Sequence, residues 1–126
     1  FYNRPGGLPG NDDAGSLSSA YIFSSLGMFP AIPGVAGFAL NTPLFSGAEI
    51  SLGDGRVIRV KTTGPQDAVY VQTASLNGKP WTSAWLPLSE LAAGGTLEFQ
   101  LGPEPSAWGS DPAEAPPSFD KIEQAP

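Results

Sequence analysis

Glycine and proline divide this chain into short segments, and their positions limit which elements can form. The chain has 16 glycines and 14 prolines among its 126 residues, a share close to that of disordered proteins. The two residue types gather in turns, however, and clear apolar runs lie between them. Gly6-Gly7 and Pro9-Gly10 mark residues 1–11 as a loop. We therefore expect one helix and several short strands, separated by tight turns.

The expected helix covers residues 12–26. Asn11 or Asp12 is the expected N-cap, because such side chains accept hydrogen bonds from the exposed N–H groups of a first helical turn. Gly27 is a natural stop, and Pro30 prevents continuation. The serine and alanine residues within the segment are small, which favours close packing against neighbouring helices.

Strand patterns follow the helix. Gly53-Asp54-Gly55 and Asn77-Gly78 are typical of hairpin turns. Residues 89–95 form a one-turn helix or a loop in this interpretation. The strands are expected at residues 38–40, 48–53, 56–64, 68–76, 79–87 and 96–102.

This order predicts an α+β fold: one N-terminal helix followed by a mostly antiparallel sheet of about five or six strands, forming a two-layer α/β sandwich. An all-β sandwich with one appended helix is the alternative. We expect residues 1–110 to form the folded unit, with the candidate site and the helix in residues 1–30. Residues 111–126 are expected to form a Pro-rich acidic tail. The whole segment from Pro103 should wrap a surface or be disordered.

The charge and the missing residue types exclude several functions. The net charge is −6, and the six Lys and Arg residues are scattered, so nucleic acid is not an expected partner. No apolar run is long enough to span a membrane. Cysteine and histidine are absent, which excludes disulfides, the usual zinc sites and a complete Ser-His-Asp triad within this chain. Any chemistry must use carboxylates, hydroxyls, amides or the backbone.

The adjacent carboxylates of Asp12 and Asp13 are the main candidate for chemistry. In a first helical turn they would lie near the positive end of the helix dipole, which favours the charged form. An ionised carboxylate suits a general base or a cation ligand rather than a general acid. Simple helix capping is the alternative and is common for acids at helix starts. Gly7, Gly10 and Gly15 flank the pair and permit close approach of a ligand.

Two further binding patterns remain open. Asn11, Asp12 and Asp13 supply part of a Ca²⁺ shell, but the spacing of an EF-hand is missing, so other ligands would come from elsewhere. Exposed aromatic residues form sugar-binding platforms, although core packing is the commoner role for strand tryptophans. The aromatic residues in question are Trp81, Trp85, Trp108, Tyr70 and Tyr2.

The segment GLPGNDDAGSLSSAYIFSSLGMFPAIPG resembles the sequence pattern of glycoside hydrolase family 92, the calcium-dependent α-mannosidases. The resemblance continues in order through NTPLF at 41–45, VQTASLNGKPW at 71–81 and GGTLEFQLGPEPSAWG at 94–109. Two positions depart from the pattern: Ala20 stands where the family usually has Trp, and Leu88 where it often has His.

The resemblance implies the C-terminal part of an inverting exo-α-mannosidase that removes terminal α-linked mannose from glycans. Asp13 matches the family's general base, with Asp12 supporting it as the second member of the catalytic pair. Asn11 and Gly10 match substrate-binding positions. Asp13 is also a possible Ca²⁺ ligand. The general acid and the other calcium ligands lie upstream in the family, so the isolated chain is expected to be inactive.

The resemblance also predicts the context of this chain. The family has an N-terminal β-sandwich and a catalytic (α/α)₆ barrel, and these would be the protein partners of this part. The chain lacks an initiator Met, which leads us to expect a piece of a longer polypeptide. Its location would be extracytoplasmic, either secreted or periplasmic, in a bacterium. The alternative function is a non-catalytic carbohydrate-binding or structural accessory domain.

Overall fold

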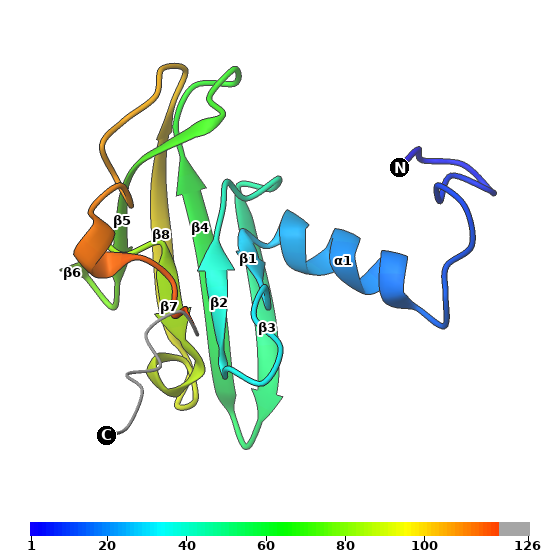
Figure 1. Ribbon diagram of the computed structural model, residues 1–126, viewed down its shortest axis with the longest axis horizontal. Coiled ribbons are helices and arrows are strands. Elements are labelled where there is room, and N and C mark those ends of the chain that lie inside the picture. Colours follow the sequence, from blue (N-terminus) through cyan, green and yellow to red (C-terminus); the bar gives the residue numbers. More distant parts are fainter. Residues whose placement is uncertain (119–126) are drawn as a thin grey trace, which may run out of the picture.

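The structure, a computed structural model, describes residues 1–118 and contains one helix beside two sheets (Figure 1). The five-stranded sheet has the order β3-β4-β8-β5-β6, and the three-stranded sheet has the order β1-β2-β7. No helix in this part of the chain is long and apolar enough to cross a membrane. The elements are α1 (Ser16–Ser25), β1 (Met28–Phe29), β2 (Gly37–Leu40), β3 (Gly47–Gly53), β4 (Arg56–Thr63), β5 (Tyr70–Leu76), β6 (Lys79–Pro80), β7 (Trp85–Pro87), η1 (Leu88–Glu90), β8 (Gly95–Gly102) and η2 (Pro112–Glu114).

The two sheets share one apolar core. The five-stranded sheet contributes alternate residues of β4 and β8, among them Val60, Leu97 and Phe99, and the three-stranded sheet contributes Met28 and Leu86. Each of these five side chains is at most 2% exposed. The α+β class is therefore confirmed. The layer that faces the five-stranded sheet is a second sheet, as in the alternative arrangement, and α1 lies beside the sheets (Figure 1).

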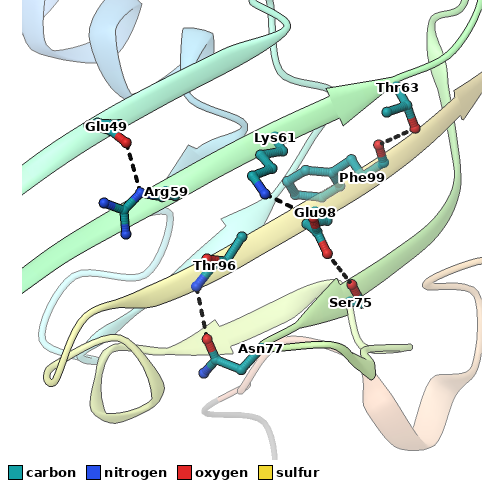
Figure 2. Close-up of polar contacts among 9 residues, drawn as sticks. All are labelled: Glu49, Arg59, Lys61, Thr63, Ser75, Asn77, Thr96, Glu98 and Phe99. Carbon is teal, nitrogen blue, oxygen red and sulfur yellow. Dashed lines mark hydrogen bonds and ion pairs between the residues drawn. The ribbon is translucent and has the colours of Figure 1, made fainter.

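The two predicted hairpin turns are confirmed. Asp54-Gly55 has φ angles of 50° and 75°, and Asn77-Gly78 has φ angles of 52° and 78°. Two successive left-handed residues match the twist of the flanking strands, and Asp, Asn and Gly tolerate this conformation. The Asn77 Oδ1 atom also accepts a hydrogen bond from the Thr96 backbone N–H at 2.9 Å, which joins this turn to β8 (Figure 2).

The order of the strands differs from a simple series of hairpins. Strand β8 lies between β4 and β5, parallel to β4 and antiparallel to β5, so the sheet is mostly antiparallel with one parallel pair. The single strand expected at residues 79–87 is a wrong prediction, because β6 and β7 belong to different sheets. Strand β7 pairs with β2 at Gly37, where a Cβ atom would lie 2.4 Å from the ring of Trp85. Only glycine leaves room for that ring.

The segment after β8 wraps the sheets as far as the structure describes it. The Ser106 hydroxyl donates to the Val71 carbonyl at 2.6 Å, and the Thr82 hydroxyl donates to Glu114 at 2.8 Å. The indole N–H of Trp108 donates to the carbonyl of Trp81 at 2.8 Å. The expectation of a wrapping segment is thus confirmed for residues 103–118, whereas 119–126 lie outside the described residues.

The outer face of the five-stranded sheet is polar. Arg59 donates to Glu49 at 2.7 Å, Lys61 pairs with Glu98 at 3.5 Å, and the Ser75 hydroxyl donates to Glu98 at 3.5 Å (Figure 2). Such exposed pairs contribute little to stability. The Arg59, Glu49, Lys61 and Glu98 side chains are all 45% exposed or more, so this face is in contact with solvent in the described part of the chain.

Candidate active site

The candidate site is the turn that precedes α1. The helix begins at Ser16, so the prediction of a helix from residue 12 is wrong at its N-terminal end. Asp13, Ala14 and Gly15 have φ angles of 48°, 56° and 92°, and this left-handed backbone cannot continue into a right-handed helix. Neither acid therefore lies in the first helical turn, which also corrects that expectation.

Asp12 caps the helix from outside. Its Oδ1 atom accepts hydrogen bonds from both the backbone N–H and the hydroxyl of Ser18, each at 2.9 Å. Its backbone carbonyl accepts from the N–H of Leu17 at 3.2 Å. Ser18 is the third residue of α1, so Asp12 provides a partner for an N–H that no helical carbonyl can reach. The N-cap position itself is Gly15, so the expectation of Asn11 or Asp12 as the N-cap is wrong; the Asp12 carboxylate instead binds a first-turn N–H from outside the helix.

Ser18 is a functional residue that the sequence pattern did not predict. The small size of the helix serines predicts only close packing, and a chain without histidine has no complete Ser-His-Asp triad. The signal that would have identified Ser18 is its place near a helix start, six residues after an aspartate, where a carboxylate finds both a backbone and a hydroxyl donor.

Asp13 has a different environment. It is exposed, and within residues 1–118 its carboxylate makes no hydrogen bond or ion pair. A non-glycine residue with positive φ is uncommon, although aspartate tolerates it better than most. Backbone strain of this kind gathers at functional sites. The two neighbouring acids therefore differ: Asp12 is held by Ser18, and Asp13 is presented to the solvent.

Gly10 and Asn11 complete the exposed turn. Both are exposed, and Gly10 has a φ angle of 71° that favours glycine. The structure thus brings all four predicted site residues, Gly10 to Asp13, into one turn at the end of α1 that points away from the sheets (Figure 1). Nothing in the described part of the chain covers this turn.

An open hollow of about 720 Å³ lies between the N-terminal loop and α1, and none of the turn residues Gly10 to Asp13 lines it. The ring of Phe1 lies 4.9 Å from the ring of Tyr21, and the Arg4 guanidinium lies 5.0 Å from the centre of the Tyr2 ring. The loop closes tightly, because the Tyr2 N–H donates to the Gly7 carbonyl at 2.9 Å. A Cβ atom at Gly7 would collide with the Tyr2 carbonyl, so this position requires glycine.

The carboxylates form only part of a metal site. Residues 1–118 contain no cluster of three or more His, Cys, Asp or Glu side chains that could hold a metal ion. Asp13, Asn11 and the second oxygen of Asp12 remain as oxygen donors. Because Ca²⁺ takes about six to eight oxygen ligands, this turn would supply a minority of a calcium shell.

The five candidate aromatic residues do not gather into one platform. Trp85 is 7% exposed, and Trp81 and Trp108 pack against the apolar core. Trp108 meets Phe99 edge to face, with ring centres 6.5 Å apart. The core role is therefore confirmed for the three tryptophans, and Tyr2 lies apart from them in the N-terminal loop. Tyr70 is 42% exposed and lines a small open hollow together with Trp108.

Replacing Asp12 should loosen the start of the helix. We expect Asp12→Ala to lower the free energy of unfolding by about 1–2 kcal/mol, because it removes the cap of the helix. Ser18→Ala removes only the hydroxyl donor and should cost about half as much. Urea unfolding followed by circular dichroism measures both. Asp13→Asn is the matched control and should change the free energy of unfolding by no more than about 0.5 kcal/mol. An equal loss of unfolding free energy in all three variants would show that Asp12 does not stabilise the start of the helix.

Comparison with known proteins places the whole site within one family. Residues 1–103 match the model of the glycosyl hydrolase family 92 catalytic domain. A protein of Arthroderma benhamiae, described as an uncharacterized secreted glycosidase, is 37% identical over 123 residues, which are 94% of this chain and 16% of that protein.

Two solved structures from Bacteroides thetaiotaomicron have the same fold. A family GH92 inverting mannosidase is 33% identical with a TM-score of 0.79, and the match covers 87% of this chain and 15% of that one. A family GH92 alpha-mannosidase is 25% identical with a TM-score of 0.86, and covers 93% of this chain and 16% of that one. This chain thus spans only about a sixth of the length of these relatives.

Proposed function

Because this chain belongs to glycosyl hydrolase family 92, we propose that it is part of an inverting exo-α-mannosidase and supplies the base side of its active site. The observation that carries the proposal is the exposed Asp13 carboxylate, which has no partner among residues 1–118. A relative at 33% identity is described as an inverting mannosidase, which supports the choice of reaction. The substrate would be a glycan that ends in α-linked mannose.

In the proposed mechanism, Asp13 removes a proton from a water molecule as the water oxygen attacks the anomeric carbon. A general acid from the rest of the protein protonates the departing glycosidic oxygen. Inverting enzymes hold the two carboxyl groups about 6.5–9.5 Å apart, which leaves room for the water. The exposed position of Asp13 provides one side of such a gap. The isolated chain would be inactive, since it contains only this side.

The neighbouring residues have supporting roles in this proposal. Asp12 and Ser18 are positioning residues, because their two hydrogen bonds hold the turn against the start of α1. The side-chain amide of Asn11 is exposed and is suited to hydrogen bonding with sugar hydroxyls, and Gly10 lets the substrate approach the backbone. Gly10 and Asn11 lie two to three residues before Asp13 in the same turn, so they would contact the same sugar ring.

Calcium is the proposed cofactor. Asp13 or Asn11 would contribute one or two oxygens, and the rest of the protein would provide the remaining ligands. When bound, the ion supplies positive charge and coordination positions for sugar hydroxyls. The proposed location is extracytoplasmic, which agrees with the description of the Arthroderma relative as secreted.

The configuration of the first sugar product tests this proposal. The full-length protein should release β-mannose from an aryl α-mannoside, and proton NMR detects it before mutarotation produces the α form. Release of α-mannose first would indicate a retaining enzyme and contradict the role of Asp13 as a base. The absence of any mannose release, with the protein folded and supplied with Ca²⁺, would favour a non-catalytic accessory domain.

A further inference from the structure

A small open hollow lies where β5 begins, between the segment after β2 and the segment after β8. Its volume is about 240 Å³, and none of the turn residues Gly10 to Asp13 lines it. Two of the five aromatic residues considered for a sugar platform meet here. We call it the Tyr70 hollow, and the lining residues that matter for its chemistry are Asn41, Thr42, Val69, Tyr70, Ser106 and Trp108.

Aromatic and apolar side chains form part of the lining. Tyr70 is 42% exposed and Val69 is 60% exposed. The ring of Trp108 is partly buried and meets the core residue Phe99 edge to face. The C–H groups on one face of a sugar ring pack against such surfaces, and a tyrosine adds a polar tip to its apolar ring. These side chains can therefore hold a sugar ring by its less polar face.

The polar groups of the hollow have an excess of acceptors. Within the described part of the chain, the Tyr70 hydroxyl has no hydrogen-bond partner, and no N–H or O–H group donates to the Asn41 Oδ1 atom. The Asn41 side-chain N–H donates to the Ser24 carbonyl at 3.0 Å, and the Thr42 hydroxyl donates to the Val69 carbonyl at 2.8 Å. The Thr42 oxygen keeps its acceptor lone pairs. A fitting ligand therefore carries several hydroxyl donors.

The charge and the size of the hollow narrow the class of ligand. Among residues 1–118, no charged side chain lines it, whereas a hollow of the same volume on the outer face of the five-stranded sheet contains the Lys61–Glu98 ion pair. A charged ligand in the Tyr70 hollow would lose hydration without gaining an opposite charge, so a neutral ligand is favoured. Drug-sized ligands occupy pockets of about 300–1,000 Å³. A volume of about 240 Å³ therefore suits a single sugar residue.

Hydrogen bonds hold the walls of the hollow in place. The Ser106 hydroxyl donates to the Val71 carbonyl at 2.6 Å, which ties the segment after β8 to β5. The backbone N–H of Trp108 donates to the Ser106 Oγ atom at 3.1 Å, and its indole N–H donates to the Trp81 carbonyl at 2.8 Å. A ligand that enters such a preformed site needs to order few side chains, which lowers the free-energy cost of binding.

We propose that the Tyr70 hollow binds one neutral sugar residue of a glycan. The sugar ring would pack against Tyr70 and Trp108, and its hydroxyls would donate to Asn41 and Thr42 and bond with the Tyr70 hydroxyl. The choice of mannose as this sugar rests on the proposed function, in which the substrate ends in mannose. Binding here adds no chemical step. It would hold a glycan to the protein and so raise the local concentration of its other sugars.

Photolabelling of the full-length protein tests this proposal. The probe is a thio-α-mannoside that carries an alkyl diazirine, because its sulfur link resists hydrolysis. After illumination and digestion, mass spectrometry quantifies the labelling of the peptides that contain Tyr70 or Trp108. We expect labelling that saturates with probe concentration and that an excess of methyl α-mannoside suppresses.

Variants of Tyr70 should weaken binding in steps. Tyr70→Ala removes both the ring and the hydroxyl, so the probe concentration for half-maximal labelling of the Trp108 peptide should rise at least about 10-fold. Tyr70→Phe removes only the hydroxyl and should raise this concentration about 2–10-fold. Tyr21→Ala is the matched control, because Tyr21 is 40% exposed and does not line the hollow. Its effect should stay within about twofold.

The absence of saturable labelling at these peptides would overturn the proposal, and so would equal half-maximal concentrations for Tyr70→Ala and Tyr21→Ala. If Tyr70→Ala does not fold, Tyr70→Phe replaces it, and a half-maximal concentration equal to that of Tyr21→Ala is then the contradictory result. The readout does not depend on turnover. An Asp13→Asn variant with normal kcat would sink the proposed base and leave the labelling intact, whereas an active protein without the labelling would contradict only the Tyr70 hollow.

Discussion

Asp13→Asn in the full-length protein is expected to lower kcat by about 10²–10⁴-fold while leaving the fold unchanged. Asparagine has the same shape as aspartate but cannot take a proton from water. The fold should persist because Asp13 is exposed and makes no side-chain contact within residues 1–118. Asparagine also tolerates a φ angle of 48° at least as well as aspartate does. Turnover of an aryl α-mannoside measures the effect.

Asp54→Asn is the matched control for this prediction. Asp54 is another exposed aspartate in a turn, with a φ angle of 50°, and it lies at the β3–β4 hairpin. Its replacement removes one negative charge at nearly the same backbone conformation, so kcat should stay within about twofold. If Asp13→Asn kept a kcat similar to that of the control, the carboxylate would not be the base.

Phe99→Ala is expected to have the largest effect on stability, lowering the free energy of unfolding by about 3–5 kcal/mol. Phe99 is 1% exposed in the central strand β8, between β4 and β5. The substitution would leave a cavity in the core between the two sheets, and it would remove the edge-to-face contact with Trp108. Domains of this size are stable by only about 5–15 kcal/mol, so the loss is a large fraction of the total. Urea unfolding followed by tryptophan fluorescence provides the measurement.

Phe29→Ala makes the same chemical change at an exposed position. Phe29 is 37% exposed on β1, outside the shared core, and its replacement should cost about 1 kcal/mol or less. The difference between the two variants isolates the effect of burial. A Phe99→Ala variant as stable as Phe29→Ala would mean that the two sheets do not share one packed core.

Local sequence patterns predicted the parts of the fold that depend on neighbouring residues. The turns at Asp54-Gly55 and Asn77-Gly78 follow from residues that tolerate positive φ, and the alternating apolar residues identified most strands. The insertion of β8 between β4 and β5 was not predictable in this way, because it depends on pairing between residues about 37 positions apart, such as Val60 with Leu97. No local turn motif in the sequence indicates that β8 pairs with β4 and β5.

For the candidate site, too, some features were predictable from the sequence and others were not. The acid pair and its neighbours were recognisable because the segment resembles a family pattern, and the capping preference of aspartate was recognisable from chemistry alone. The predicted helix start is wrong, since nothing in the sequence indicates that the left-handed backbone of Asp13 continues through Ala14, a residue type that normally avoids it. That backbone moves both acids out of the helix.

The sequence by itself determined the α+β class, the two hairpin turns, the absence of histidine and cysteine chemistry, and the segment that carries the acids. Only the tertiary structure decided that Asp12 is bound by Ser18 while Asp13 is exposed, and that α1 lies uncovered beside the sheets. The physical reason is that composition and periodicity report what each residue prefers locally. Whether Asp12 or Asp13 binds Ser18 depends on the φ and ψ angles of the turn, because these angles set the direction of each side chain.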